Sequence, residues 1–181
     1  MPITRILVLY GIVAGLIVGI PVDWLALSRT PDWVSDNMML LTYLAMIVGL
    51  TAVFLGVKHY RDKTLGGVIR FVPALLLGLG ISAVASLIYA LCWETSLALT
   101  GSDFAGAYAK QMIEAARAKG LSPAELQKAI AEAEAFAKSY SNPLHRIPVT
   151  FLEMFPVGVL ISLISAGLLR NPRVLPARAP T

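Results

Sequence analysis

Residues 71–93 read FVPALLLGLGISAVASLIYALCW, a run of sequence without a charged side chain. A membrane-spanning helix needs ~20 mostly apolar residues to cross ~30 Å of hydrocarbon. Because lipid offers no hydrogen-bonding partners, the backbone N–H and C=O groups of such a run must be paired within the segment, as they are in a helix. This stretch therefore predicts a transmembrane helix and an integral membrane protein.

Three further apolar runs cover residues 6–22, 38–57 and 154–169. The last reaches full spanning length only if it starts near Ile147, which places Glu153 inside it. Charged residues make up 14% of the 181 residues, against ~25% in an average soluble domain. We expect an all-α fold with a single membrane domain. Its four transmembrane helices are predicted at about residues 4–27, 38–57, 70–97 and 147–169.

The basic residues alternate from one connecting segment to the next. Arg5 precedes the first run, and residues 58–70, KHYRDKTLGGVIR, carry four basic residues against Asp62 alone. Residues 23–37 instead carry one arginine, Arg29, against three aspartates, whereas the tail at 170–181 has three arginines and no acid. Since lysine and arginine gather on the cytoplasmic side, this alternation predicts that both termini are cytoplasmic. Topology and contact with the lipid bilayer also account for the net charge of +4, so no nucleic-acid partner is expected.

Residues 94–146 differ in composition, being rich in Ala, Glu, Lys and Gln, which favour helices. Gly120 is typical of a helix end, and Ser122, Pro123 and Glu125 form a capping-box pattern that starts a second helix. We therefore predict an extracytoplasmic helical hairpin at about residues 103–141. Apolar residues recur at helical spacing in both arms, so the arms are expected to pack on each other or on the membrane surface. The alternative is that this face binds a periplasmic or membrane protein partner, or covers a site between the membrane helices.

Small residues recur on one stripe of each predicted membrane helix. Small side chains let membrane helices approach closely, so these stripes predict a tight bundle instead of a wide aqueous pore. A homo-oligomer formed through the stripe of the first helix is the alternative. The glycines in these stripes are Gly11, Gly15, Gly19, Gly49, Gly56, Gly78 and Gly158.

Glu153 is the leading candidate for a functional residue, because an ionised carboxylate inside a bilayer is costly and must be neutral or paired. Glu94 lies at the outer end of the third predicted helix, and His145 and Arg146 precede the fourth. Two nearby acids would share a proton or bind a cation. The alternative is a structural role, in which Glu153 hydrogen-bonds a hydroxyl such as that of Thr51 or pairs with Arg146.

The sequence contains no nucleophile motif, phosphate-binding loop or haem motif, so no catalytic residue and no cofactor are predicted. The only cysteine is Cys92, which excludes a disulfide within the chain and a cysteine-type zinc site. His59 and His145 fall in segments predicted to lie on opposite sides of the membrane. No metal site is expected.

Several segments together resemble one bacterial family, the four-helix membrane proteins catalogued as domain of unknown function 4199. These segments are GVKHYRDK with the following double glycine, SLIYAL, NPLHR and TFLEMFPVGVLISLISAGLLR. The resemblance covers essentially the whole chain and is most specific from Asn142 to Arg170. It implies the same topology and a location in the bacterial cytoplasmic (inner) membrane. It draws attention to residues 60–63 and 142–144 without implying an activity.

The leading functional interpretation is a non-enzymatic accessory or scaffold protein that acts through protein contacts. The rival interpretation is a small proton-linked carrier or ligand-binding membrane protein centred on Glu153 and Glu94. A membrane enzyme acting on lipid is the third, and no set of residues in the sequence suggests its reaction.

Overall fold

The computed structural model describes residues 2–28 and 31–176, and their regular structure is entirely helical. The helices are α1 (Ile3–Leu27), α2 (Asp32–Asp36), α3 (Met38–Thr64), α4 (Phe71–Thr100), α5 (Phe104–Ala118), α6 (Pro123–Tyr140) and α7 (Pro143–Leu169). Arg29 and residues 177–181 of the predicted tail lie outside the described residues.

Four of these helices, α1, α3, α4 and α7, are long and apolar enough to cross a membrane. Each includes one of the apolar runs. The helices extend beyond those runs, since α3 continues through the basic segment to Thr64 and α7 begins at Pro143 instead of near Ile147. The short helix α2 had no counterpart among the predicted elements. The chain is therefore an all-α protein with the helices of a multi-pass membrane protein.

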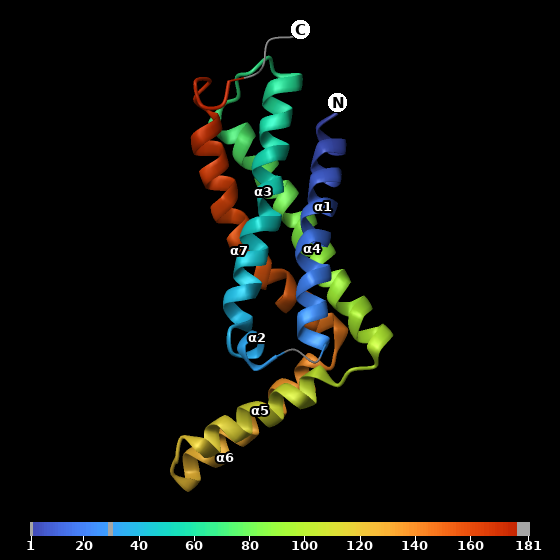
Figure 1. The fold of residues 1–181 in the computed structure, drawn as a ribbon, viewed down its shortest axis with the longest axis vertical. Coiled ribbons are helices and arrows are strands. Elements are labelled where there is room, and N and C mark those ends of the chain that lie inside the picture. Colours follow the sequence, from blue (N-terminus) through green and yellow to red (C-terminus); the bar gives the residue numbers. More distant parts are fainter. Residues whose placement is uncertain (1, 29–30, 177–181) are drawn as a thin grey trace. The chain divides into compact units, whose positions relative to one another are not determined.

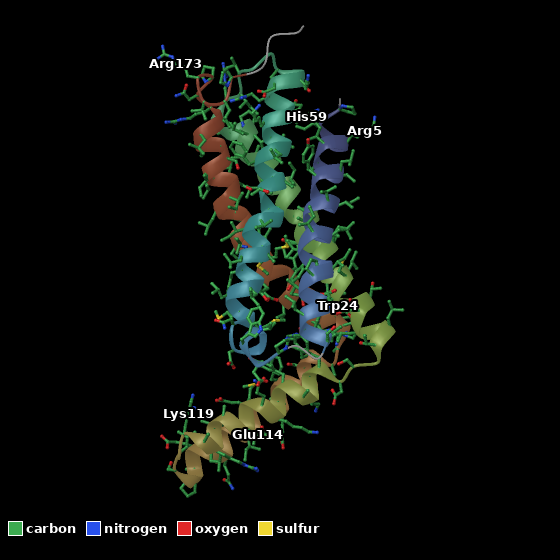
Figure 2. The ribbon with its side chains drawn as sticks, in the orientation of Figure 1. Arg5, Trp24, His59, Glu114, Lys119 and Arg173 are labelled. Carbon is green, nitrogen blue, oxygen red and sulfur yellow. The ribbon has the colours of Figure 1, made fainter. Side chains whose placement is uncertain are left out.

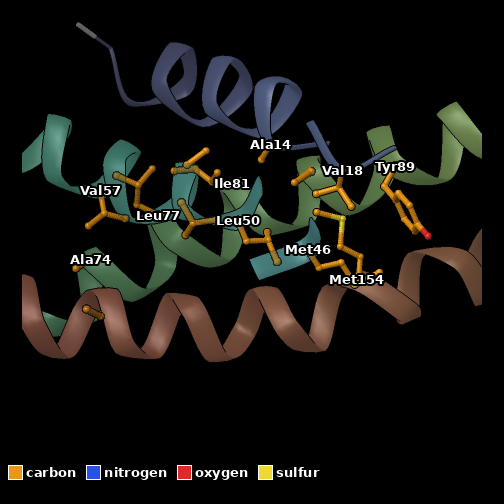
Figure 3. Close-up of a cluster of buried hydrophobic side chains, with 14 of the residues drawn as sticks. Ala14, Val18, Met46, Leu50, Val57, Ala74, Leu77, Ile81, Tyr89 and Met154 are labelled. Carbon is orange, nitrogen blue, oxygen red and sulfur yellow. The ribbon is translucent and has the colours of Figure 1, made fainter. Parts of the chain in front are cut away.

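The chain divides into two compact units. The helical bundle comprises residues 1–93 and 150–181, and the 94–149 unit comprises the end of α4, α5, α6 and the start of α7. In the helical bundle, α1, α3, α4 and α7 run side by side (Figure 1). Their apolar side chains fill the space between the helices, as Val18, Met46, Ile81 and Met154 do in Figure 3.

The glycine stripe of α1 packs against α4. A methyl group on Gly11 would lie 2.6 Å from Cβ of Val84, and one on Gly15 would lie 2.7 Å from the carbonyl oxygen of Ala85. The same group on Gly19 would lie 2.9 Å from Cβ of Cys92. Real carbon atoms do not approach so closely, so glycine at these positions sets how near the two backbones lie.

Glycines of the other helices lie at similar contacts. Gly49 of α3 faces Val18, and Gly56 faces Ile81. On α4 and α7, Gly78 lies against Ser162 and Gly158 against Ser82, in antiparallel register. The Ser82 hydroxyl donates to the Gly158 carbonyl at 3.1 Å, which adds a polar bond between α4 and α7 where the helices are closest.

In the 94–149 unit, α5 and α6 run antiparallel and lie side by side (Figure 1). Aromatic rings connect them, with Tyr108 against Phe136 at 5.3 Å and Phe104 against Tyr140 at 6.0 Å between ring centroids. Buried alanines of both helices, such as Ala109 and Ala133, allow the backbones to approach.

The ends of α5 and α6 follow the sequence signals. Asp103 caps α5 by accepting the Gly106 N–H at 2.9 Å. Gly120 adopts a φ of 64°, a left-handed conformation that residues with a Cβ rarely take, and so permits the sharp turn. Ser122 and Glu125 then form the capping box, in which each side chain accepts the other residue's N–H.

Candidate functional site

The clearest arrangement of charged side chains is an ion pair between Glu94 and Arg146. Arg146 donates from Nε to Oε1 of Glu94 and from Nη2 to Oε2, both at 2.6 Å. Its third nitrogen, Nη1, donates to the Tyr140 carbonyl at 3.0 Å, and the guanidinium lies 5.7 Å from the centre of the Tyr140 ring. Both charged side chains are largely buried, with 12% and 18% exposure. Such two-pronged pairs are strong and geometrically specific.

The local sequence places these groups. Glu94 lies toward the end of α4, and Arg146 lies in the first turn of α7. Asn142 starts that turn, because its side-chain oxygen accepts the Leu144 N–H at 3.0 Å and its carbonyl accepts the Arg146 N–H at 3.0 Å. Pro143 follows at a position where no N–H is needed. The Asn142-Pro143-Leu144 segment is thus the cap of α7, and it sets the position from which Arg146 reaches Glu94.

His145 is exposed, and its backbone N–H donates to the Asn142 carbonyl at 3.0 Å. Of the four candidate residues, the structure joins Glu94 and Arg146 directly and places His145 beside Arg146 in sequence. With its carboxylate in the ion pair, Glu94 is not simply a solvated group. Glu94 and Arg146 connect the end of α4 to the start of α7.

Glu153 is placed differently from the structural alternatives considered in the sequence. Its side chain is exposed on α7 and has no hydrogen-bond or ion-pair partner among the described residues. Arg146 binds Glu94, and the Thr51 hydroxyl donates to the carbonyl of Val48 in its own helix. The expected bond of Glu153 to either residue is therefore wrong. Both residues have nearer partners.

Arg61 is a structural centre that the sequence pattern did not identify. Its side chain has 0% exposure, and it donates from Nε to Asp62 at 2.6 Å. The other guanidinium nitrogens donate to the carbonyls of Leu169 at 3.4 Å, Val174 at 3.0 Å and Leu175 at 2.5 Å. Lys58 also binds Asp62.

Through these bonds, Arg61 at the end of α3 holds the last carbonyl groups of α7 and the chain that follows. Helix ends leave such carbonyls without partners, so a buried guanidinium serves as their cap. The same end of the helical bundle carries Arg5, His59 and Arg173, whereas Trp24 lies toward the other end (Figure 2). In the sequence, Arg61 was only one of four basic residues in a predicted loop.

Polar groups also occur inside the helical bundle. Asp23 is 4% exposed, because α1 continues to Leu27 and so includes a residue that had been counted in the first loop. The apolar residues after it were the available signal. The hydroxyls of Ser86 and Thr150 are buried without a hydrogen-bond partner among the described residues, a condition that usually marks a place for an ordered water.

Neither the geometry nor the comparisons supply a catalytic set. Within residues 2–28 and 31–176, no group of three or more His, Cys, Asp or Glu side chains is arranged to hold a metal ion. No curated protein and no solved structure matches the chain. One family model, described as "Protein of unknown function (DUF4199)", matches residues 9–171, from the first turns of α1 to just beyond α7. The chain belongs to this family, as its motifs predicted.

Proposed function

We propose that this protein is an accessory or scaffold component of the bacterial inner membrane that acts through contacts with other proteins. The observation that carries this proposal is the use of its buried charges. Arg61 caps a helix end, and Glu94 and Arg146 bind each other. Side chains whose hydrogen bonds are all directed within the chain stabilise a structure and are poorly placed for a reaction.

The 94–149 unit supports a role in binding. Its apolar side chains are used between α5 and α6, and charged residues such as Lys110, Glu114 and Glu132 remain exposed. A charged outer face gives a partner specificity and a faster encounter more than it gives affinity. We assign this face to the extracytoplasmic side, with both chain termini in the cytoplasm, because basic residues alternate between the connecting segments.

Copurification tests the scaffold role. Epitope-tagged protein extracted in a mild detergent is expected to retain a partner at fixed stoichiometry. Reversing exposed charges, with Glu114→Arg and Glu132→Arg together, is expected to release that partner while the melting temperature stays within a few degrees. Leu76→Ala, on the lipid-facing surface of α4, is the control that should retain it. Purification without a stoichiometric partner would overturn the scaffold proposal.

Cysteine labelling tests the orientation in intact cells. In a Cys92→Ala background, a cysteine at Lys128 is expected to react with a membrane-impermeant reagent. A cysteine at Thr64, at the end of α3, is expected to react only after the membrane is permeabilised. The opposite pattern would reverse the assigned topology.

The second candidate function is a proton-linked carrier, and the exposed carboxyl of Glu153 favours it. A carrier requires this group to ionise during each cycle, whereas a scaffold does not. Glu153→Gln keeps the size of the side chain and removes its titration. Loss of a pH-dependent growth or transport phenotype with unchanged stability would support the carrier. Full complementation at every pH would exclude Glu153 as the coupling residue.

A further inference from the structure

Helix α7 has two distinct faces within the helical bundle. One face packs inside the bundle through residues spaced as Thr150, Met154, Gly158 and Ser162. The other carries an exposed row that we name the outer stripe, in which successive members are alternately three and four residues apart. The outer stripe consists of Glu153, Pro156, Leu160, Leu163 and Gly167.

The spacing of the outer stripe is that of a coiled-coil seam. Positions separated alternately by three and four residues stay on one side of a helix when two helices wrap around each other. A helix that only faces lipid has no need for this period, since any apolar residue suits a lipid-facing position. The stripe therefore resembles a surface for another helix.

Two polar groups on this face lack the bonds that a membrane helix normally makes. Glu153 has no hydrogen-bond partner among the described residues. Pro156 has no N–H, so it cannot donate to the carbonyl of Leu152, four residues earlier. Lipid tails can satisfy neither group, and an acidic side chain in a membrane helix is expensive without a partner.

Gly167 differs from the other glycines of the four membrane helices. A methyl group on each of the others would lie 3.0 Å or less from a neighbouring helix, whereas one on Gly167 would have nothing of the described chain within 4 Å. Small residues in membrane helices typically mark close helix contacts. This one has no neighbour within its own chain.

We propose that the outer stripe of α7 packs against the outer stripe of a second copy of this chain. Copies inserted by the same signals share one orientation, so the two α7 helices run parallel and are related by a twofold axis along the membrane normal. The axis brings like residues together. Leu160 and Leu163 then pack on their own counterparts, and Gly167 lets the backbones approach.

The carboxyl group of Glu153 favours a second copy over a different partner. A protonated carboxylic acid both donates and accepts a hydrogen bond, so two such groups facing each other satisfy both without any counterion. The glycine stripe of α1, the earlier candidate for self-association, is already occupied by α4. A dimer through α7 uses a face that the bundle leaves exposed.

Disulfide cross-linking in native membranes tests the dimer. In a Cys92→Ala background, single cysteines replace Leu160 and Leu163 on the outer stripe. The control is Leu76→Cys on α4, which is 63% exposed and lies close in register to Ile164, since Gly78 faces Ser162. Dimers linked at Leu160 and Leu163 but not at Leu76 are the expected result. Equal linking at all three positions would indicate random collisions and would overturn the proposal.

Substitutions on the stripe separate dimerisation from folding. Gly167→Leu fills open space in the single chain, so the protein should fold normally while the dimer weakens. Glu153→Leu removes the interhelical hydrogen bond and is expected to weaken the dimer about three- to fifteen-fold, the range seen for such bonds in membranes. Glu153→Gln retains a donor and an acceptor and should preserve the dimer. Association unchanged by Gly167→Leu and Glu153→Leu, or cross-links only to a protein of different mass, would overturn the α7 pairing.

Discussion

The helical bundle and the 94–149 unit of this chain are stabilised by different kinds of contact. In the bundle, glycines such as Gly15 and Gly158 place one backbone directly against the next helix. In the 94–149 unit, aromatic pairs such as Tyr108 and Phe136 join α5 to α6, and side-chain caps define the helix ends. Lipid gives no hydrophobic drive for helix association, so the bundle depends on close fit. The 94–149 unit instead has the apolar contacts and end caps of helices in water.

The two units also use arginine differently. Arg61 is fully buried and binds backbone carbonyls, whereas Arg146 is partly exposed and binds a carboxylate. Neither carbonyl groups nor Arg61 has a replacement partner if one is removed, while water can reach Glu94 and Arg146. We therefore expect substitutions in the bundle to have larger effects than those in the 94–149 unit.

The largest effect is expected at Arg61. Arg61→Met removes the bonds to three backbone carbonyls and one of the two cations at Asp62, and should lower the free energy of unfolding by about 3 kcal/mol. Lys63→Met is the matched control, because Lys63 is exposed and removes the same charge from the same segment. Thermal unfolding in detergent measures both. Equal losses would show that only the charge of this segment matters.

The next effect concerns the contact of α1 with α4. Gly15→Leu forces a side chain against Ile88 and the carbonyl of Ala85, so it should cost about 2 kcal/mol through overpacking and separation of the helices. Val13→Leu enlarges an exposed residue on the same helix and should change stability by less than about 0.5 kcal/mol. If the two variants melt at the same temperature, close fit is not what stabilises the bundle.

A smaller effect is expected for the ion pair of the 94–149 unit. A double-mutant cycle with Glu94→Gln and Arg146→Gln should give a coupling energy of about 1–2 kcal/mol, because the pair is two-pronged and largely buried. The same cycle for Lys128 and Glu132, which are 3.9 Å apart and well exposed, should give about 0.3 kcal/mol. Equal couplings would mean that Glu94 and Arg146 are effectively solvated.

The sequence could predict the features that depend on local patterns. Apolar run length predicted four membrane helices, and the Ser122 to Glu125 capping box predicted the start of α6. The roles of Arg61 and Glu94 were not predictable in this way. Their partners lie 52 or more residues away, and only the folded chain shows which carbonyl or charge each one meets.

The assignment of Asp23 to a loop failed for a related reason. A charged residue was taken as the end of the membrane run, although the apolar residues after it continue α1 to Leu27. The interior of the folded bundle accommodates Asp23, which a local window of hydropathy does not detect. Glu153 shows the converse case, since it was predicted inside an apolar helix and lies on the exposed face.

The smallest effect separates the two units by pH. The side-chain and backbone hydrogen bonds of Ser122 hold the pKa of the Glu125 carboxyl below its ordinary value of 4.5. A lowered pKa means that the ionised form stabilises the folded state, so this contribution is complete above pH 4.5 and disappears as the pH falls through the lower, folded value. Amide exchange near the start of α6 should therefore accelerate over that acidic range, while exchange in the glycine-packed centre of α1 should show no such added step. Ser122→Ala removes the bonds and should give fast exchange at the start of α6 at every pH. An acid step of equal size in Ser122→Ala would show that the capping box is not its cause.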